Sequence, residues 1–282
     1  MNAADPLPWL LGENSPSARY WALTSLLGLP GSDPEVRSAR DTIPLVEPAW
    51  EILNAQWPQG YWIGPGVGYS PKHKATVWQI IFLGALGAPR TEAIDRACDY
   101  VLRHSRLPDG RFSAYKSAKG ATLCLNGNLL RSMCQLGYWD PRLDESLEAL
   151  AETINRHGFR CRFNISGPPP PRMSDGLPCA WGSIKALGAL ATVQDRSPMV
   201  QAAIARGIDF LFSADLARGD YPTATGISPL WHEFGFPLGY ASDLLEALDV
   251  LGQLGCGAEP RLAAAVQVVV GKRDHAGRWN LD

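Results

Sequence analysis

The sequence has little that marks a membrane or nucleic-acid protein. Its 282 residues carry a formal net charge of −2, which does not call for a polyanionic partner such as nucleic acid. The longest apolar stretch, Leu262–Val270, is much shorter than the roughly 20 residues that a membrane helix needs. No basic segment followed by an apolar one opens the chain, so no secretory signal is expected. These absences predict a cytoplasmic protein without a membrane span.

The six cysteines form no Cys-x-x-Cys pair, and strand-like alternation is absent from the whole chain. In a chain of this length without a secretory signal, a disulfide framework is not expected. Cys98, Cys134 and Cys256 lie within or beside apolar helix faces, where a cysteine usually packs as a small apolar side chain.

What the chain does contain is a repeated pair of markers. A turn with glycine followed by an aromatic residue recurs, with the glycines 50, 48, 61 and 58 residues apart. A Leu-Gly or Leu-Ala pair that closes an apolar stretch alternates with this turn. The turn glycines are Gly60, Gly110, Gly158, Gly219 and Gly277, and the closing pairs end at Gly28, Gly87, Gly137, Ala191 and Gly255. Two markers kept in alternation predict five copies of one structural repeat.

Each repeat is predicted to be a pair of helices. In the fourth, Ile184, Leu187 and Leu190 recur at helical spacing, and Val200 and Ile204 repeat this pattern after a break. Ser197-Pro198, Asp140-Pro141 and Glu259-Pro260 are typical helix starts, since an oxygen-bearing cap is followed by proline. The sequence therefore predicts an all-α protein with one domain over residues 1–282 and repeats at about 16–62, 74–112, 121–163, 178–222 and 234–279.

The turn Gln56 to Gly60 to Trp62 resembles the QW repeats of squalene cyclases, and the helix-pair spacing is similar to that of prenyltransferase β subunits. The resemblance implies an α/α toroid, a double ring of helical pairs around a cavity. The first helices are short and nearly uncharged, as an inner ring would be, whereas second helices such as 141–156 carry the charges. Toroids of this family have six or more pairs, so with five repeats a closing pair is expected to be missing.

Four soft side chains are the candidate metal ligands. Cys124 and Cys179 stand in the same phase at the starts of the third and fourth first helices, His232 precedes the fifth, and Cys161 lies in the turn before the fourth. Thiolates and an imidazole are suited to tetrahedral zinc. If they instead work without a metal, Cys124 and Cys179 are candidate catalytic thiols. Packing as apolar side chains is the alternative role for all of the cysteines.

The resemblance has consequences for this site. Cys179 and His232, 53 residues apart, are similar to the last two zinc ligands of prenyltransferase β subunits. The aspartate of that motif does not match, because Asp175 lies four residues before Cys179, and Cys124 or Cys161 would have to replace it. The Asp-x-Asp-Asp acid of class II terpene cyclases is absent, which argues against squalene cyclisation in the strict sense.

Further candidates are aromatic, acidic and basic side chains. Phe236, Tyr240 and Asp243 are spaced to share one face of the fifth first helix, where Tyr240 and Asp243 would assist catalysis or cap a neighbouring turn. Trp78 and Trp181 are expected to line the cavity or to pack the helix pairs. Loops before the first helices carry positive charges that would receive a diphosphate or carboxylate, unless they only solvate the surface; Lys116 and Lys119 are the substrate-binding candidates among them.

Three functions stay open at this point. The first is a prenyltransferase- or cyclase-like enzyme that acts on a hydrophobic, isoprenoid-type small molecule with zinc. The second is a metal-free lyase or hydratase that uses Cys124, Cys179 and Asp243 as acid and base. The third is a helical-repeat scaffold whose cysteines only pack. A partner subunit or a homodimer would be compatible with each of them.

Overall fold

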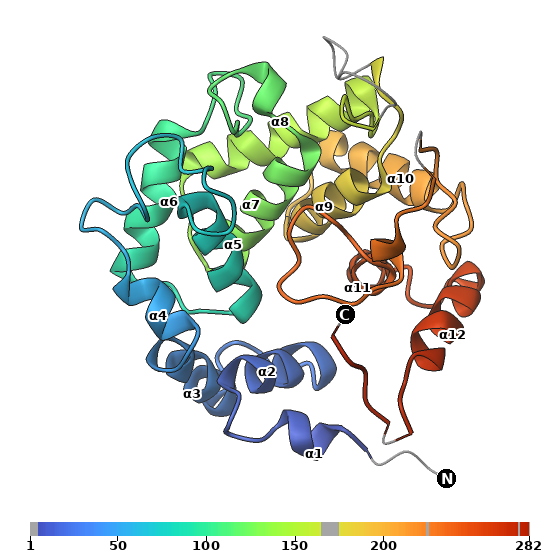
Figure 1. The fold of residues 1–282 in the computed structure, drawn as a ribbon, viewed down its shortest axis with the longest axis horizontal. Helices are drawn as coiled ribbons and strands as arrows, with labels where there is room; N and C mark the ends of the chain where they lie inside the picture. Colours follow the sequence, from blue (N-terminus) through green and yellow to red (C-terminus); the bar gives the residue numbers. More distant parts are fainter. Residues whose placement is uncertain (1–4, 165–174, 224–225, 276, 282) are drawn as a thin grey trace. The chain divides into compact units, whose positions relative to one another are not determined.

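The computed structural model describes residues 5–164, 175–223, 226–275 and 277–281. In these ranges the chain folds into α-helices with short 3-10 and π segments, and no strand occurs beyond two isolated bridges (Figure 1). The all-α prediction is therefore confirmed for the described part of the chain. None of its helices combines the length and the apolarity that crossing a bilayer requires.

The chain divides into two compact units. The first comprises residues 1–105 and 132–139, and the second residues 106–131 and 140–282. The prediction of a single domain stays a prediction. In the first unit, the helices are α1 (Leu7–Leu10), α2 (Pro16–Trp21) with its π extension (Ala22–Leu26), α3 (Pro34–Thr42), α4 (Ala49–Asn54), α5 (Thr76–Leu86) and α6 (Glu92–His104).

The second unit contains the remaining helices. Helix α7 (Leu123–Gln135) begins in this unit and ends in the first. The others are α8 (Pro141–His157), α9 (Ala180–Ala191), α10 (Pro198–Leu211), α11 (Leu244–Gln253) and α12 (Ala263–Gly271). Helix α10 packs against α8 and α9, and α11 packs against α9 and α12. The contact of α8 with α10 thus joins two second helices, and the contact of α9 with α11 joins two first helices.

Four of the five predicted helix pairs recur, as α5–α6, α7–α8, α9–α10 and α11–α12, whereas the first predicted repeat (16–62) contains α2 with its π extension, α3 and α4. The fifth pair starts later than predicted, because α11 begins at Leu244 and not near residue 234. Phe236 and Tyr240 therefore lie in a non-helical segment, and the prediction that they share a helix face with Asp243 is wrong. The reason is local: the sequence Gly235-Phe236-Pro237-Leu238-Gly239 is poor in helix formers, and Asp243 supplies a strong N-cap.

Three of the five repeated glycine-aromatic turns have a common geometry. Gly60, Gly110 and Gly277 have φ values of 92°, 87° and 82°, a region that side chains other than glycine rarely adopt. In each case, the glycine N–H donates to the carbonyl three residues earlier, at 2.9 to 3.1 Å. Glycine occurs at these three positions because the turn requires a positive φ.

The aromatic side chain of the turn donates a hydrogen bond to a backbone carbonyl near the end of the preceding helix. Trp62 Nε1, Tyr221 Oη and Trp279 Nε1 each donate to a carbonyl ten residues earlier, on Ile52, Leu211 and Val269, at 2.7, 2.6 and 2.6 Å. The last carbonyls of a helix have no partner within the helix. The aromatic marker therefore recurs because the fold uses it to end the second helix of a repeat.

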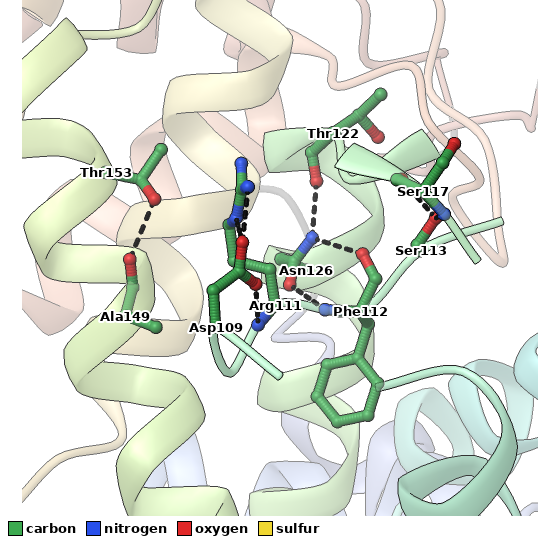
Figure 2. Close-up of polar contacts among 9 residues, drawn as sticks. All are labelled: Asp109, Arg111, Phe112, Ser113, Ser117, Thr122, Asn126, Ala149 and Thr153. Atoms are coloured by element: carbon green, nitrogen blue, oxygen red, sulfur yellow. Dashed lines mark hydrogen bonds and ion pairs between the residues drawn. The ribbon is translucent and has the colours of Figure 1, made fainter. Parts of the chain in front are cut away.

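Asn126 fixes the second such turn to the next first helix (Figure 2). Its Oδ1 accepts from the Phe112 N–H at 2.7 Å, and its Nδ2 donates to the Phe112 and Thr122 carbonyls at 2.9 Å each. Both Asn126 and Phe112 are buried. Beside them, Arg111 folds back onto Asp109 in an ion pair of 2.6 Å.

We expect Asn126→Leu to lower the free energy of unfolding by about 2 kcal/mol, because it leaves the buried N–H and carbonyl of Phe112 without partners. Chemical denaturation of the purified chain measures this change. Thr153→Ala is the matched control, since it removes only a hydrogen bond to the Ala149 carbonyl within α8, and it should change stability by less than about 0.5 kcal/mol. Equal losses in the two variants would contradict this role of Asn126.

First helices approach one another closely where glycine allows it. A Cβ added to Gly127 on α7 would lie 2.3 Å from the Lys185 carbonyl carbon on α9. In the first unit, a Cβ on Gly84 of α5 would lie 2.7 Å from the Ser132 Cβ of α7. The first helices are also buried almost all round: in α9, every residue from Gly182 to Leu190 is buried. The nearly uncharged composition of these helices follows from this burial.

Candidate functional site

Three of the predicted cysteines come together in the second unit. Cys124 is buried in the first turn of α7, and Cys179 is the N-cap of α9, where its Sγ accepts from the Gly182 N–H at 3.5 Å. Both therefore stand at the start of a first helix, as predicted. Cys161 reaches them from the turn after α8, because the backbone pairs Cys161 N with Leu177 O and Cys179 N with Phe159 O, both at 2.9 Å.

Gly176 makes this pairing possible. A Cβ at this position would lie 1.9 Å from the Cys161 carbonyl oxygen, so only glycine lets the two segments pass each other. The isolated antiparallel bridge between Arg160 and Pro178 lies between the two pairs. Arg160 reinforces the contact by donating from Nη1 to the Gly176 carbonyl at 2.9 Å. Close backbone approach thus brings the Cys161 side chain next to the N-cap of α9.

The three thiols are linked through Cys179. The hydrogen bond between Cys179 and Cys124, together with burial, raises the pKa of the Cys179 thiol to about 12, although the bond from Cys161 opposes this. The hydrogen bond from Cys161 to Cys179, with burial, raises the pKa of Cys161 far above its ordinary value. These directions indicate that Cys161 donates to Cys179, and that Cys179 donates to Cys124. We call this set the thiol chain (Cys161, Cys179, Cys124).

His232 has another partner. Its Nε2 lies 2.8 Å from the Ala217 carbonyl oxygen, within hydrogen-bond distance. Among the residues that the structure describes, no three His, Cys, Asp or Glu side chains are arranged to hold a metal ion. Thiolates are soft ligands that suit zinc. The described positions of the three cysteines and His232, however, do not form a zinc site. Zinc binding by Cys124, Cys161, Cys179 and His232 stays a prediction.

Asp243 has a structural role in the described geometry. It caps α11, accepting from the Glu246 N–H at 2.7 Å, and it also accepts from the Gly235 backbone. Burial raises the pKa of this carboxyl above its ordinary value. Asp243 thus ties the segment that enters α11 to the start of its own helix, which is the capping role that the sequence left open, while its catalytic role stays a prediction.

The segment before α11 is attached to the helices around the thiol chain. Asn128 Nδ2 on α7 donates to the Gly239 carbonyl at 2.9 Å, and Ser242 Oγ donates to the Trp181 carbonyl on α9 at 3.4 Å. In this segment Tyr240 is half-buried, and the side chain of Phe236 is 56% exposed. Both are therefore held in the second unit, but by the backbone of their loop and not by a helix.

The two predicted cavity tryptophans differ in exposure. Trp78 on α5, in the first unit, is buried, and its Nε1 donates to the Tyr69 carbonyl at 2.9 Å. The His73 ring packs edge-on against it at 4.9 Å between centroids. Trp78 therefore packs against the loop that leads into α5, and its predicted cavity role stays a prediction. Trp181 is half-buried on the first turn of α9.

A positively charged loop lies beside the thiol chain. Lys116 and Lys119 are exposed in the segment that leads into α7, and Arg162, next to Cys161, lies with its Nη1 3.5 Å from the Lys119 carbonyl. Tyr115 and Phe163 expose 65% and 52% of their surface in the same two segments. Cationic and aromatic side chains thus adjoin the thiols. Arg172, another basic residue of these loops, lies outside the described residues.

A buried ionic network in the second unit was not predicted from the sequence. Lys185 in the middle of α9 is only 2% exposed, and its Nζ lies 2.8 and 2.7 Å from the two carboxylate oxygens of Glu246 on α11. Arg131 on α7 lies 3.6 Å from Glu246 and 3.0 Å from Asp249. A single lysine inside the otherwise uncharged stretch Trp181–Leu190 was the available indication.

The comparisons with known proteins add no relative. No model of a known protein family matches the chain, and a search of the curated proteins finds no matching sequence.

Proposed function

We propose that this chain is an enzyme of the squalene cyclase and prenyltransferase type, in which the helical pairs form a double ring that lacks a closing pair. Its substrate is a hydrophobic small molecule, with isoprenoids as the first class to test. The observation that carries the proposal is the thiol chain, in which three side chains from three separate segments meet at the starts of α7 and α9. The meeting of three thiols from separate segments beside the starts of two first helices supports a shared chemical role for them.

The surroundings of the thiol chain support the substrate class. The exposed Lys116 and Lys119 and the neighbouring Arg162 favour an anionic group such as a diphosphate. The exposed rings of Tyr115 and Phe163 offer apolar surface to a hydrocarbon tail. A molecule with an anionic head and an apolar tail matches both features, and an isoprenoid diphosphate is such a molecule.

The raised pKa of Cys179 limits the roles that this thiol can have in catalysis. A thiol with a pKa of about 12, as for Cys179, is almost entirely protonated at neutral pH, and efficient acid–base groups have pKa values near the working pH. This argues against the metal-free lyase in which Cys179 is a general acid or base. In the enzyme that we propose, a thiol has to lose its proton as substrate binds.

The second candidate is a helical-repeat scaffold, and a specific observation favours it. Two predicted site residues have structural roles, since Trp78 packs against the loop before α5 and Asp243 caps α11. In a scaffold, the thiol chain would only fill space between α7 and α9. This candidate predicts that replacing the thiols changes stability alone.

The test is turnover of isoprenoid alcohols, their diphosphates and a long isoprenoid hydrocarbon by the reduced full-length chain, with products identified by mass spectrometry. We expect turnover of the diphosphates, reduced about 100-fold or more in Cys179→Ser, in the range for removal of a group that takes part in catalysis. Serine keeps an N-cap on α9, so this variant should fold. Cys256→Ser, which alters a half-buried cysteine outside the thiol chain, is the matched control.

The outcomes separate the candidates. No turnover by the reduced chain, or full turnover by Cys179→Ser, would contradict the enzyme proposal and favour the scaffold. Metal analysis of the same reduced samples tests the zinc prediction. Near-stoichiometric zinc that is lost in Cys179→Ser would support it, and metal-free protein would contradict it.

A further inference from the structure

The thiol chain has a property that the proposed catalytic role does not use. All of its members are free cysteines, and Cys179 is hydrogen-bonded to each of the other two. Cys161 and Cys179 are half-buried and Cys124 is buried, so a small reagent in solvent would meet one of the first two before Cys124. Adjacent thiols with access to solvent are the arrangement from which regulatory disulfides form.

Geometry favours one of the two possible pairs. Cys161 and Cys179 are diagonal neighbours across the bridge of Arg160 and Pro178, a relation in which residues are about 7–8 Å apart. Disulfides usually join residues whose Cα atoms are about 4.4–6.8 Å apart. A bond between Cys161 and Cys179 would therefore have to distort the bridge.

Cys124 and Cys179 converge on Gly182 instead. The Cys179 Sγ lies 3.5 Å from the Gly182 backbone nitrogen. A Cβ placed on Gly182 would lie 3.7 Å from the Cys124 Sγ and 3.3 Å from the Leu123 Cβ. The first turns of α7 and α9 are thus in direct contact, with both sulfurs at the contact point. Because Gly182 has no side chain, nothing from this residue separates them.

We propose that Cys124 and Cys179 form a reversible disulfide that inactivates the site in response to a small-molecule disulfide such as oxidised glutathione. The thiolate of one cysteine attacks the small disulfide, forming a mixed disulfide and releasing one small thiolate. The thiolate of the other cysteine attacks the protein sulfur of that mixed disulfide and releases the second small thiolate. Both small thiolates take up the protons that the two cysteines lost, so two protein thiols are oxidised and one small disulfide is reduced.

The disulfide removes two members of the thiol chain and leaves Cys161 as a free thiol. Cys179 then has no S–H to donate to Cys124. Since the hydrogen bond to Cys124 and burial raise the pKa of Cys179, the exchange should be slow at neutral pH. The expected loss of activity rests on the proposed function, whereas formation of the disulfide does not.

The experiment is disulfide mapping on the full-length chain. The reduced protein is equilibrated with oxidised and reduced glutathione in increasing ratio, quenched in acid, alkylated, digested and analysed by mass spectrometry without reduction. We expect a peptide pair that links Cys124 to Cys179, in full yield at the most oxidising ratio and reversed by excess thiol. The link should be absent in Cys124→Ser and in Cys179→Ser, and should persist in Cys256→Ser.

Two results would overturn the inference: Cys179 carrying only glutathione, or Cys179 linked to Cys161 while Cys124 stays free. Cys124→Ser is the second variant, and it is expected to fold because Cys124 does not cap a helix and serine is close to cysteine in volume. A missing link in this variant therefore does not result from misfolding. If the predicted link forms but the reduced chain turns over no substrate, the disulfide stands and the proposed function fails. If turnover occurs but no link forms at any ratio, the disulfide inference fails alone.

Discussion

Replacing Glu246 with leucine lowers the free energy of unfolding by about 3–5 kcal/mol, the usual cost of breaking a buried ion pair. Glu246 holds the ammonium group of Lys185, which is 2% exposed, at 2.7 and 2.8 Å. The leucine variant leaves that ammonium in an apolar interior. Urea denaturation followed by circular dichroism measures the loss.

The two partners of this pair are expected to respond unequally. Lys185→Met should cost less than Glu246→Leu, because Arg131 lies 3.6 Å from Glu246 and continues to neutralise it. The double variant Lys185→Met/Glu246→Leu should recover most of the stability, since a well-packed apolar pair often replaces a buried ion pair without net loss. If the double variant lost as much stability as the two single variants together, Lys185 and Glu246 would not be a coupled ion pair. A coupled pair loses less than that sum.

The second large effect is expected at Gly127. Its added Cβ would lie 2.3 and 2.4 Å from the carbonyl carbon and oxygen of Lys185 and 2.6 Å from the Ala186 nitrogen. All of these atoms belong to the α9 backbone, which cannot rotate away as a side chain would. Gly127→Ala should therefore force α7 and α9 apart and lower the free energy of unfolding by about 3 kcal/mol, at the upper end for overpacked sites.

Gly252→Ala is the matched control for this variant. Gly252 is an exposed residue inside α11, and no atom lies within 4 Å of its added Cβ. There, alanine should stabilise the helix by about 1 kcal/mol, because it has the higher helix propensity. Thermal denaturation of both variants gives the comparison. If Gly127→Ala and Gly252→Ala were stabilised to a similar extent, α7 and α9 would not be in close contact at Gly127.

The sequence by itself determined the repeated helical pairs, for local reasons. Proline after a capping side chain starts a helix wherever it occurs, as at Ser197-Pro198 and Asp140-Pro141, and both helices begin there. Gly60, Gly110 and Gly277 are needed for a positive φ, and an aromatic residue closes the turn. Such requirements act over a few residues, so periodicity alone reveals them. The same local chemistry placed Cys124 and Cys179 at helix starts.

Only the tertiary structure decided which of these residues meet. The sequence assigned Phe236 and Tyr240 to a helix, whereas the cap at Asp243 delays α11 to Leu244. Nothing near Lys185 in the sequence identifies Glu246 as its partner, because α9 and α11 are joined only by packing. Cys161 reaches Cys179 through a backbone pairing that depends on Gly176. Contacts between distant segments depend on the packing of whole helices, and a pattern read along one segment contains no information about that packing.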